Sequence, residues 1–145
     1  MPFYTPDNYQ QSESVGFLLN KARNQLAADM DAALKELNIR AQHSGILMSL
    51  LRGSCTTPAS LARHLSVDTG LMTRILDKLE ALGLLVRSRD LADRRVVNLQ
   101  LTPVGYAAAL RITEVAPDVL NERLQDFSDV EYDELRRLLH KLIKE

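Results

Sequence analysis

The sequence is poor in cysteine and aromatic residues, and it has no long apolar run. Cys55 is its single cysteine, which excludes an internal disulfide and leaves too few thiolates for a cysteine zinc site. No apolar stretch approaches the ~20 residues that a membrane-spanning helix requires. The N-terminal residues also lack the basic start and the apolar stretch of a signal peptide. We therefore expect a protein of the reducing cytoplasm.

Motifs typical of enzymes and cofactor sites are missing too. The chain has no glycine-rich phosphate loop, no HExxH motif and no cysteine cluster, and its three histidines do not have the spacing of metal ligands. The sequence therefore predicts no catalytic residues, no metal and no cofactor. The formal net charge of −1 neither indicates nor excludes nucleic acid, because binding depends on the charge at the contact surface.

The sequence does contain a series of helix signals in a chain of 145 residues, the size of one domain. Apolar residues at spacings of three and four predict a first helix from about Ser12 to Asn38, roughly 40 Å long at ~1.5 Å per residue. That is longer than a small domain needs to cover its own core, so we expect it to continue into a partner subunit. A second helix is expected from Ala41 to Leu51.

Two shorter helices and a hairpin are predicted next. Thr57 can cap the third helix, with Pro58 at the first position, where its missing N–H costs nothing. Asp68 can cap the fourth, which is expected to run to about Leu82 and to end at Gly83. The segments "LLVRSR" and "VVNLQL" are rich in β-formers and flank a polar loop, and apolar residues alternate in the second, which predicts a β-hairpin.

The remaining residues predict two more helices. Thr102–Pro103 repeats the cap-plus-proline pattern and predicts a helix to about Ala116, which could resume after Pro117. Ser128 and Glu131 form a capping box at the start of the last helix. This order predicts a mainly α protein with a small β-hairpin wing, that is, a winged helix-turn-helix lobe plus terminal helices.

The fourth predicted helix has two unlike faces. Its apolar residues fall within an arc of roughly 140° at ~100° per residue, and they are Leu71, Met72, Ile75, Leu76, Leu79 and Leu82. The opposite face holds Gly70, Thr73, Arg74, Asp77 and Ala81, with Thr69 and Lys78 beside it. A solvated face is the simple alternative. However, an exposed glycine costs about 1 kcal/mol of helix stability while permitting close approach. Hydroxyl, guanidinium and carboxylate groups can also read base edges in a DNA major groove.

Arginines and aspartates gather in the predicted hairpin; they are Arg87, Arg89, Arg94, Arg95, Asp90 and Asp93. A wing beside a recognition helix reaches the minor groove, which is narrow and electronegative and suits an inserted arginine. A neighbouring carboxylate can hold the guanidinium through paired hydrogen bonds. We expect Asp93 to brace the arginines, with Asp90 as a second candidate. The alternative is a polar turn whose charges only keep it soluble.

The stretch "TRILDKLEALGLLVRSRDLADRRVVNLQLTPVG" resembles the core signature of the MarR family, the multiple antibiotic resistance regulators. The parts of that signature stand in the family's order, as Thr73-Arg74, Leu76 to Glu80, Gly83-Leu84, Asp90 to Arg95, and Leu101 to Gly105. The element order and the length fit across essentially the whole chain.

The resemblance implies a homodimer that binds a pseudo-palindromic double-stranded DNA operator, usually as a repressor. It implies that Arg95 enters the minor groove and that Asp93 orients it. Many members release DNA on binding a small, often aromatic and acidic effector between the dimer helices and the DNA-binding lobe. The implied parts are a dimerisation arm and first helix at 1–37, the winged helix-turn-helix lobe at 38–101 and dimerisation helices at 102–145.

The predicted DNA contacts are Thr69, Gly70, Thr73, Arg74, Asp77, Lys78, Arg89, Asp93, Arg94 and Arg95. His43 and Arg87 are candidates for an effector, although His43 could be satisfied locally and Arg87 could face DNA or solvent. Cys55 is expected to be a small residue at a helix junction. The alternative function is a winged helix used only for protein–protein contact, and a steep salt dependence of DNA binding would distinguish the two.

Overall fold

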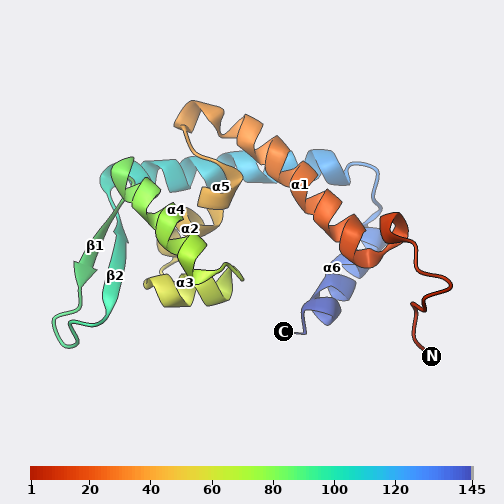
Figure 1. Cartoon of the computed structure of the whole chain (residues 1–145). Helices are drawn as coiled ribbons and strands as arrows, with labels where there is room; N and C mark the ends of the chain where they lie inside the picture. The colour runs from red at the N-terminus through yellow and green to blue at the C-terminus, as the bar shows by residue number, and fades with distance from the viewer. Residues whose placement is uncertain (145) are drawn as a thin grey trace.

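The computed structural model describes residues 1–144, which form an arch (Figure 1). A lobe that carries the hairpin stands at one end, α6 and the N-terminal residues stand at the other, and α1 and α5 run between them. The elements are α1 (Val15–Ala33), α2 (Ala41–Arg52), α3 (Pro58–His64), α4 (Thr69–Ala81), β1 (Leu85–Arg89), β2 (Val97–Leu101), α5 (Pro103–Leu124) and α6 (Asp129–Ile143). This order confirms the predicted mainly α winged helix-turn-helix architecture.

The hairpin lobe is built around one apolar core. Leu47 of α2, Leu61 of α3 and Leu76 and Leu79 of α4 are all at most 2% exposed, as is Leu99 of β2. Burying leucine side chains of this kind contributes about 1.5–3 kcal/mol each. The core therefore joins the base of the hairpin to α2, α3 and α4.

Side-chain caps set the beginnings of α3 and α4. The Thr57 hydroxyl accepts a hydrogen bond from the Ser60 N–H at 3.2 Å. The Asp68 carboxylate accepts one from the Leu71 N–H at 3.0 Å. Each cap satisfies an N–H group that has no partner within the helix. Both predicted starts are confirmed, and the predicted end of α4 is close, since Gly83 follows it with a φ of +74°.

The end of α4 and the start of α5 are joined directly. The Thr102 hydroxyl donates to the Gly83 carbonyl at 2.5 Å and accepts from the Gly105 N–H at 3.0 Å. A Cβ atom on Gly105 would lie 1.8 Å from the Leu84 carbonyl oxygen. Only a glycine therefore lets α5 pack this closely against the chain that leaves α4.

The first helix is shorter than the spacing of its apolar residues predicts. α1 begins after Ser14, whose side chain caps its first turn, and ends at Ala33. A 3₁₀ turn at Lys35–Leu37 follows, and Asn38 has a left-handed φ of 55°. The predicted range of Ser12–Asn38 is wrong at both ends, because apolar spacing does not distinguish an α-helix from an adjoining 3₁₀ turn.

The predicted end of the fifth helix near Ala116 is wrong, and the alternative of helix beyond Pro117 is confirmed without the expected break, because α5 continues through Pro117 to Leu124. Proline removes one backbone donor and strains a helix interior. The carbonyl that loses its partner is that of Thr113, and both Thr113 and Pro117 lie on the exposed side of α5, which faces water. α5 also packs along both α1 and α2, which holds its two halves in line.

α6, like α1, has no buried residue. Its exposed apolar side chains are Val130, Tyr132, Leu135, Leu138, Leu142 and Ile143. The capping box predicted at its start is present, since the Ser128 hydroxyl accepts from the Glu131 N–H and the Glu131 carboxylate accepts from the Ser128 N–H. None of the helices within residues 1–144 combines the length and apolar character that crossing a bilayer would require.

Candidate nucleic-acid interface

α4 is amphipathic, and its apolar face is fixed in the lobe. Met72, Ile75, Leu76 and Leu79 are buried, as the helical wheel predicts. Leu71 is an exception, because its side chain is 38% exposed. It lies in the first turn, at the edge of the predicted apolar arc, where α4 extends beyond the core.

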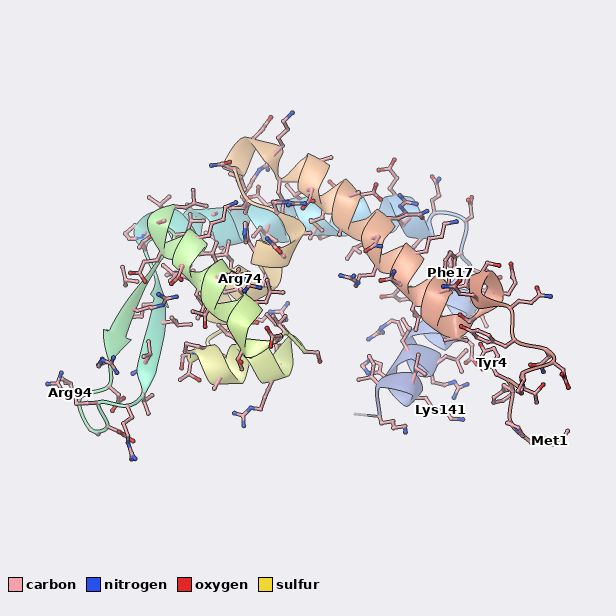
Figure 2. All side chains as sticks on the ribbon, viewed as in Figure 1. Met1, Tyr4, Phe17, Arg74, Arg94 and Lys141 are labelled. Carbon is pink, nitrogen blue, oxygen red and sulfur yellow. The ribbon has the colours of Figure 1, made fainter. Side chains whose placement is uncertain are left out.

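The polar face of α4 is open to solvent. Gly70, Thr73, Arg74, Asp77 and Lys78 are all exposed. The Thr73 hydroxyl donates back to the Thr69 carbonyl at 3.0 Å. Within residues 1–144, neither Arg74 nor Lys78 forms an ion pair. Their charges are therefore available to an external anion (Arg74 is labelled in Figure 2).

Arg87 reaches from β1 to this face of α4. Its Nη1 atom donates to Asp77 Oδ1 at 2.7 Å, and its Nε atom lies 3.6 Å from Glu80 Oε2. Asp77, a predicted DNA contact, is thus already paired with an arginine. Arg87, a candidate effector residue, points to the carboxylates of Asp77 and Glu80 on α4 instead of an enclosed cavity. Sequence reasoning missed this pair, because the two residues belong to different elements.

The hairpin loop is shaped by Asp90. Its Oδ1 atom accepts from the backbone N–H groups of Ala92 and Asp93, at 2.9 and 3.0 Å. Its Oδ2 atom accepts from the Asn98 amide at 3.1 Å. The bond from the Asp93 N–H, followed by those from Asn98 and Ala92, lowers the pKa of Asp90. The suggestion that Asp90 braces an arginine is therefore wrong: it orders the loop backbone, since a carboxylate readily closes such turns.

Asp93 and Arg95 form a forked pair at the surface of the loop. Arg95 Nε donates to Asp93 Oδ1 at 3.1 Å and Arg95 Nη2 donates to Oδ2 at 3.2 Å. The same Oδ1 accepts from the Arg95 backbone N–H at 3.1 Å. These bonds, the side-chain ones most, lower the pKa of Asp93. The Arg95 side chain remains 91% exposed, so it is oriented by the carboxylate without being buried.

The other two loop arginines have different surroundings. The Arg89 guanidinium donates to the Arg94 carbonyl at 2.8 Å and thereby closes the loop across its base. The Arg94 side chain points away from the hairpin tip (Figure 2). Leu91, which sequence reasoning passed over, is 89% exposed beside them. The tip therefore presents one apolar and several cationic side chains to the outside.

His43 lies in the interior of the lobe. Its side chain is fully buried, and its Nδ1 atom accepts from the Arg40 N–H at 3.0 Å, which caps the start of α2. Its Nε2 atom has no hydrogen-bond partner among the described residues. Burial, with smaller effects of Lys78 and Arg40, lowers the pKa of His43. The prediction of a local partner for His43 fits this position better than the prediction of an effector contact.

A groove lies between the hairpin lobe and the terminal helices. It has a volume of about 830 Å³ and is lined from α2, α5 and α6, among others by Met48, Arg52, Ile112, Leu120, Phe127 and Tyr132. Arg52 is its cationic residue, and sequence reasoning did not single it out. The helical spacing of the lining residues carries no signal for such a groove, because the three helices meet only in the folded chain.

Comparison with known proteins agrees with this geometry. A sequence model described as the MarR family matches residues 41–97. The HTH-type transcriptional repressor Rv2887 of Mycobacterium tuberculosis is 30% identical over 128 residues, which is 88% of this chain and 92% of that protein.

Two solved structures are similar over most of their length. One is a mutant MarR from Escherichia coli complexed with operator DNA, with a TM-score of 0.82, 29% identity and coverage of 88% of this chain and 92% of that one. The other is Bordetella bronchiseptica BpsR, from work on regulation of its DNA binding by 6-hydroxynicotinic acid. It has a TM-score of 0.82, 25% identity and coverage of 94% and 98%. With its winged lobe and these relatives, the chain belongs to the MarR family.

Proposed function

We propose that this protein is a DNA-binding transcriptional regulator that acts as a repressor. The observation that carries the proposal is the forked Asp93–Arg95 pair, which holds an exposed guanidinium on the hairpin. Next to the hairpin lies α4, whose Arg74 forms no ion pair within residues 1–144. A fixed, planar donor suits the narrow minor groove, and an unpaired arginine on a helix suits the major groove. The operator complex of the similar MarR structure supports the same assignment.

The contacts divide by groove. On α4, the residues proposed to face the major groove and its phosphates are Thr69, Gly70, Thr73, Arg74 and Lys78. Asp77 lies on the same face but is paired with Arg87. On the hairpin, Arg94 and Arg95 are proposed to contact the minor groove, while Arg89 and Asp93 hold the loop in shape. Gly70 leaves room for close approach, because a Cβ atom there would meet only the Asp68 carboxylate, at 3.2 Å.

A homodimer is proposed because α1 and α6 expose apolar side chains that nothing else in the described chain covers. Leu135, Leu138 and Leu142 of α6 are exposed along one side, and so are Phe17 and Leu18 of α1. Exposed apolar side chains gathered on the terminal helices indicate an interface. On this proposal residues 1–37 and 102–145 form the dimer and residues 38–101 bind DNA. Two copies related by a twofold axis would read a pseudo-palindrome.

A small acidic effector is proposed for the groove between α2, α5 and α6. The groove is mostly apolar, and its wall carries one guanidinium, Arg52, and one carboxylate, Asp129. The apolar lining suits an aromatic ring, and we propose that the ring's carboxylate pairs with Arg52. BpsR, whose DNA binding is regulated by 6-hydroxynicotinic acid, is a structural neighbour.

Selection of bound sequences from a random DNA pool, followed by titration at several salt concentrations, tests the proposed function. We expect a sequence with two inverted halves and an affinity that falls steeply as salt rises. The alternative, a winged helix for protein contact alone, predicts no enriched sequence and no salt slope.

A further inference from the structure

The guanidinium of Arg87 spans the space between the hairpin and the recognition helix. We propose that Arg87 is a positioning residue for DNA binding: it fixes the hairpin to α4 through Asp77 and Glu80, and thereby sets the distance between the two groove contacts. This inference rests on the proposed DNA-binding function.

The contacts of Arg87 lie along one side of α4. Nη1 donates to Asp77 Oδ1 at 2.7 Å, Nε lies 3.6 Å from Glu80 Oε2, and Nη2 reaches the Thr73 carbonyl at 3.5 Å. Residues 73, 77 and 80 are spaced by four and three, so they share a face of the helix. One side chain therefore contacts about two turns of α4 at once.

The Arg87 side chain is less exposed than the two carboxylates that it contacts. The Arg87 side chain is 28% exposed, whereas the side chains of Asp77 and Glu80 are 61% and 44% exposed. The guanidinium is thus enclosed between strand and helix, while its carboxylate partners face outward. An arginine that served only as a phosphate contact would present its own nitrogen atoms to the outside, as Arg95 does.

The position of Arg87 in β1 determines where the hairpin is attached to α4. Arg87 lies opposite Leu99 in the hairpin register, and Leu99 is buried in the core. Beyond this point β1 has little packing, since Ser88 and Arg89 are exposed, whereas Val97 of β2 still packs against the core. Arg87 is therefore the last residue of β1 whose side chain contacts α4 before the loop that carries Arg95.

Arg87 also neutralises the charges of Asp77 and Glu80, which would otherwise oppose DNA binding. Without Arg87, the side of α4 next to the hairpin would carry two unpaired carboxylates close to DNA phosphates, and like charges at short range repel. The planar guanidinium of Arg87 has several N–H donors in a fork, so it can contact two separate carboxylates at once. The compact ammonium group of a lysine lacks this geometry.

The test is a double-mutant cycle on operator DNA at fixed salt. We expect Arg87→Met, which keeps the apolar stem but removes the charge, to weaken binding roughly tenfold. In that background Asp77→Asn should strengthen binding, because it removes a carboxylate that has lost its partner. In the otherwise unchanged protein Asp77→Asn should weaken binding or leave it unchanged, because there it breaks the pair.

Equal strengthening by Asp77→Asn in both backgrounds would overturn the inference, since it would mean that Arg87 acts as an independent charge. No effect of Arg87→Met would overturn it as well. Arg111→Met is the matched control, because Arg111 pairs with Glu114 on α5, away from the hairpin; it should not change DNA binding. Absence of DNA binding by the unchanged protein would instead contradict the proposed function, and thermal unfolding verifies that each variant is folded.

Discussion

The carboxylate of Asp93 holds both the Nε and the Nη2 atoms of Arg95, at 3.1 and 3.2 Å, two residues further along the hairpin loop. The backbone N–H of Arg95 donates to the same carboxylate, so the side chain and the main chain are fixed together. Such a pair would contribute little to fold stability at the surface. Its effect is to keep one rotamer of an exposed arginine populated before any ligand arrives.

Asp93→Asn tests that effect, because the two interpretations predict opposite signs. If Asp93 only sits in solvent, removing a negative charge near DNA should tighten operator binding. If it orients Arg95, the variant should bind more weakly despite its more favourable charge, since an amide offers only one acceptor oxygen. We expect the second result in a titration at fixed salt, with Arg95→Ala weakening binding at least as much.

Arg74→Ala tests the face of α4. We expect a loss of about 1–3 kcal/mol on the operator if Arg74 contacts a base, and a relaxed preference at one position of each half-site. A phosphate contact would instead weaken binding to all sequences alike and reduce the salt slope by about one. Unchanged binding to every DNA would show that this face does not meet the duplex.

Gly105→Ala tests the packing of α5 on the end of α4. A Cβ atom 1.8 Å from the Leu84 carbonyl oxygen forces the backbone apart, and we expect a loss of about 2–3 kcal/mol in the free energy of unfolding. Gly16→Ala in α1 is the matched control, because nothing lies within 4 Å of its added Cβ. It should stabilise the helix by up to about 1 kcal/mol. Urea unfolding measures both, and equal stabilities would contradict the packing argument.

His43 predicts a loss of stability in mild acid. Its pKa is lowered in the folded state, by burial first, so the folded chain keeps it neutral while the unfolded chain is protonated near its usual pKa of about 6.5. The folded state then binds fewer protons, and the free energy of unfolding falls as the pH drops below that value. Urea unfolding between pH 7.5 and 5.5 should show this slope. His43→Leu should flatten it, while His64→Leu, at an exposed position, should keep it; an unchanged slope in His43→Leu would contradict the assignment.

Leu138→Glu with Leu142→Glu tests the proposed dimer. Two charges on the exposed side of α6 should yield a monomer or an insoluble chain, because they would have to be buried without partners. Mass determination in solution at micromolar concentration is the measurement. A mass of one chain for the unchanged protein would contradict the homodimer.

Local signals predicted much of this fold. Thr57, Asp68 and Ser128 each begin a helix where their side chains suggest it, because a cap is a contact between residues three apart. The hairpin follows from alternation over a few residues. Boundaries that depend on packing were less predictable. Pro117 interrupts the local pattern, yet α5 continues because two neighbouring helices support it.

The candidate site divides in the same way. The Asp93–Arg95 pair was predictable because its members are two residues apart in a short loop. Asp90 could not be separated from Asp93 by residue type, since both are carboxylates beside arginines, and only the loop conformation shows which one accepts from the backbone. Arg87 finds its carboxylates ten and seven residues back along the chain, across a turn whose geometry no local pattern specifies.

The contacts among Gly83, Thr102 and Gly105 couple the orientation of α5 to that of the lobe that carries α4 and the hairpin. The two hydrogen bonds of the Thr102 hydroxyl and the close approach of Gly105 to Leu84 hold the end of α4 tightly against the start of α5. α5 has 22 residues, or roughly 33 Å at ~1.5 Å per residue. A tilt of only ~5° about the junction would move its far end by about 3 Å over that length. Conversely, if the groove beside Phe127 moved by about the width of a side chain, the lobe that carries α4 and the hairpin would rotate by only a few degrees.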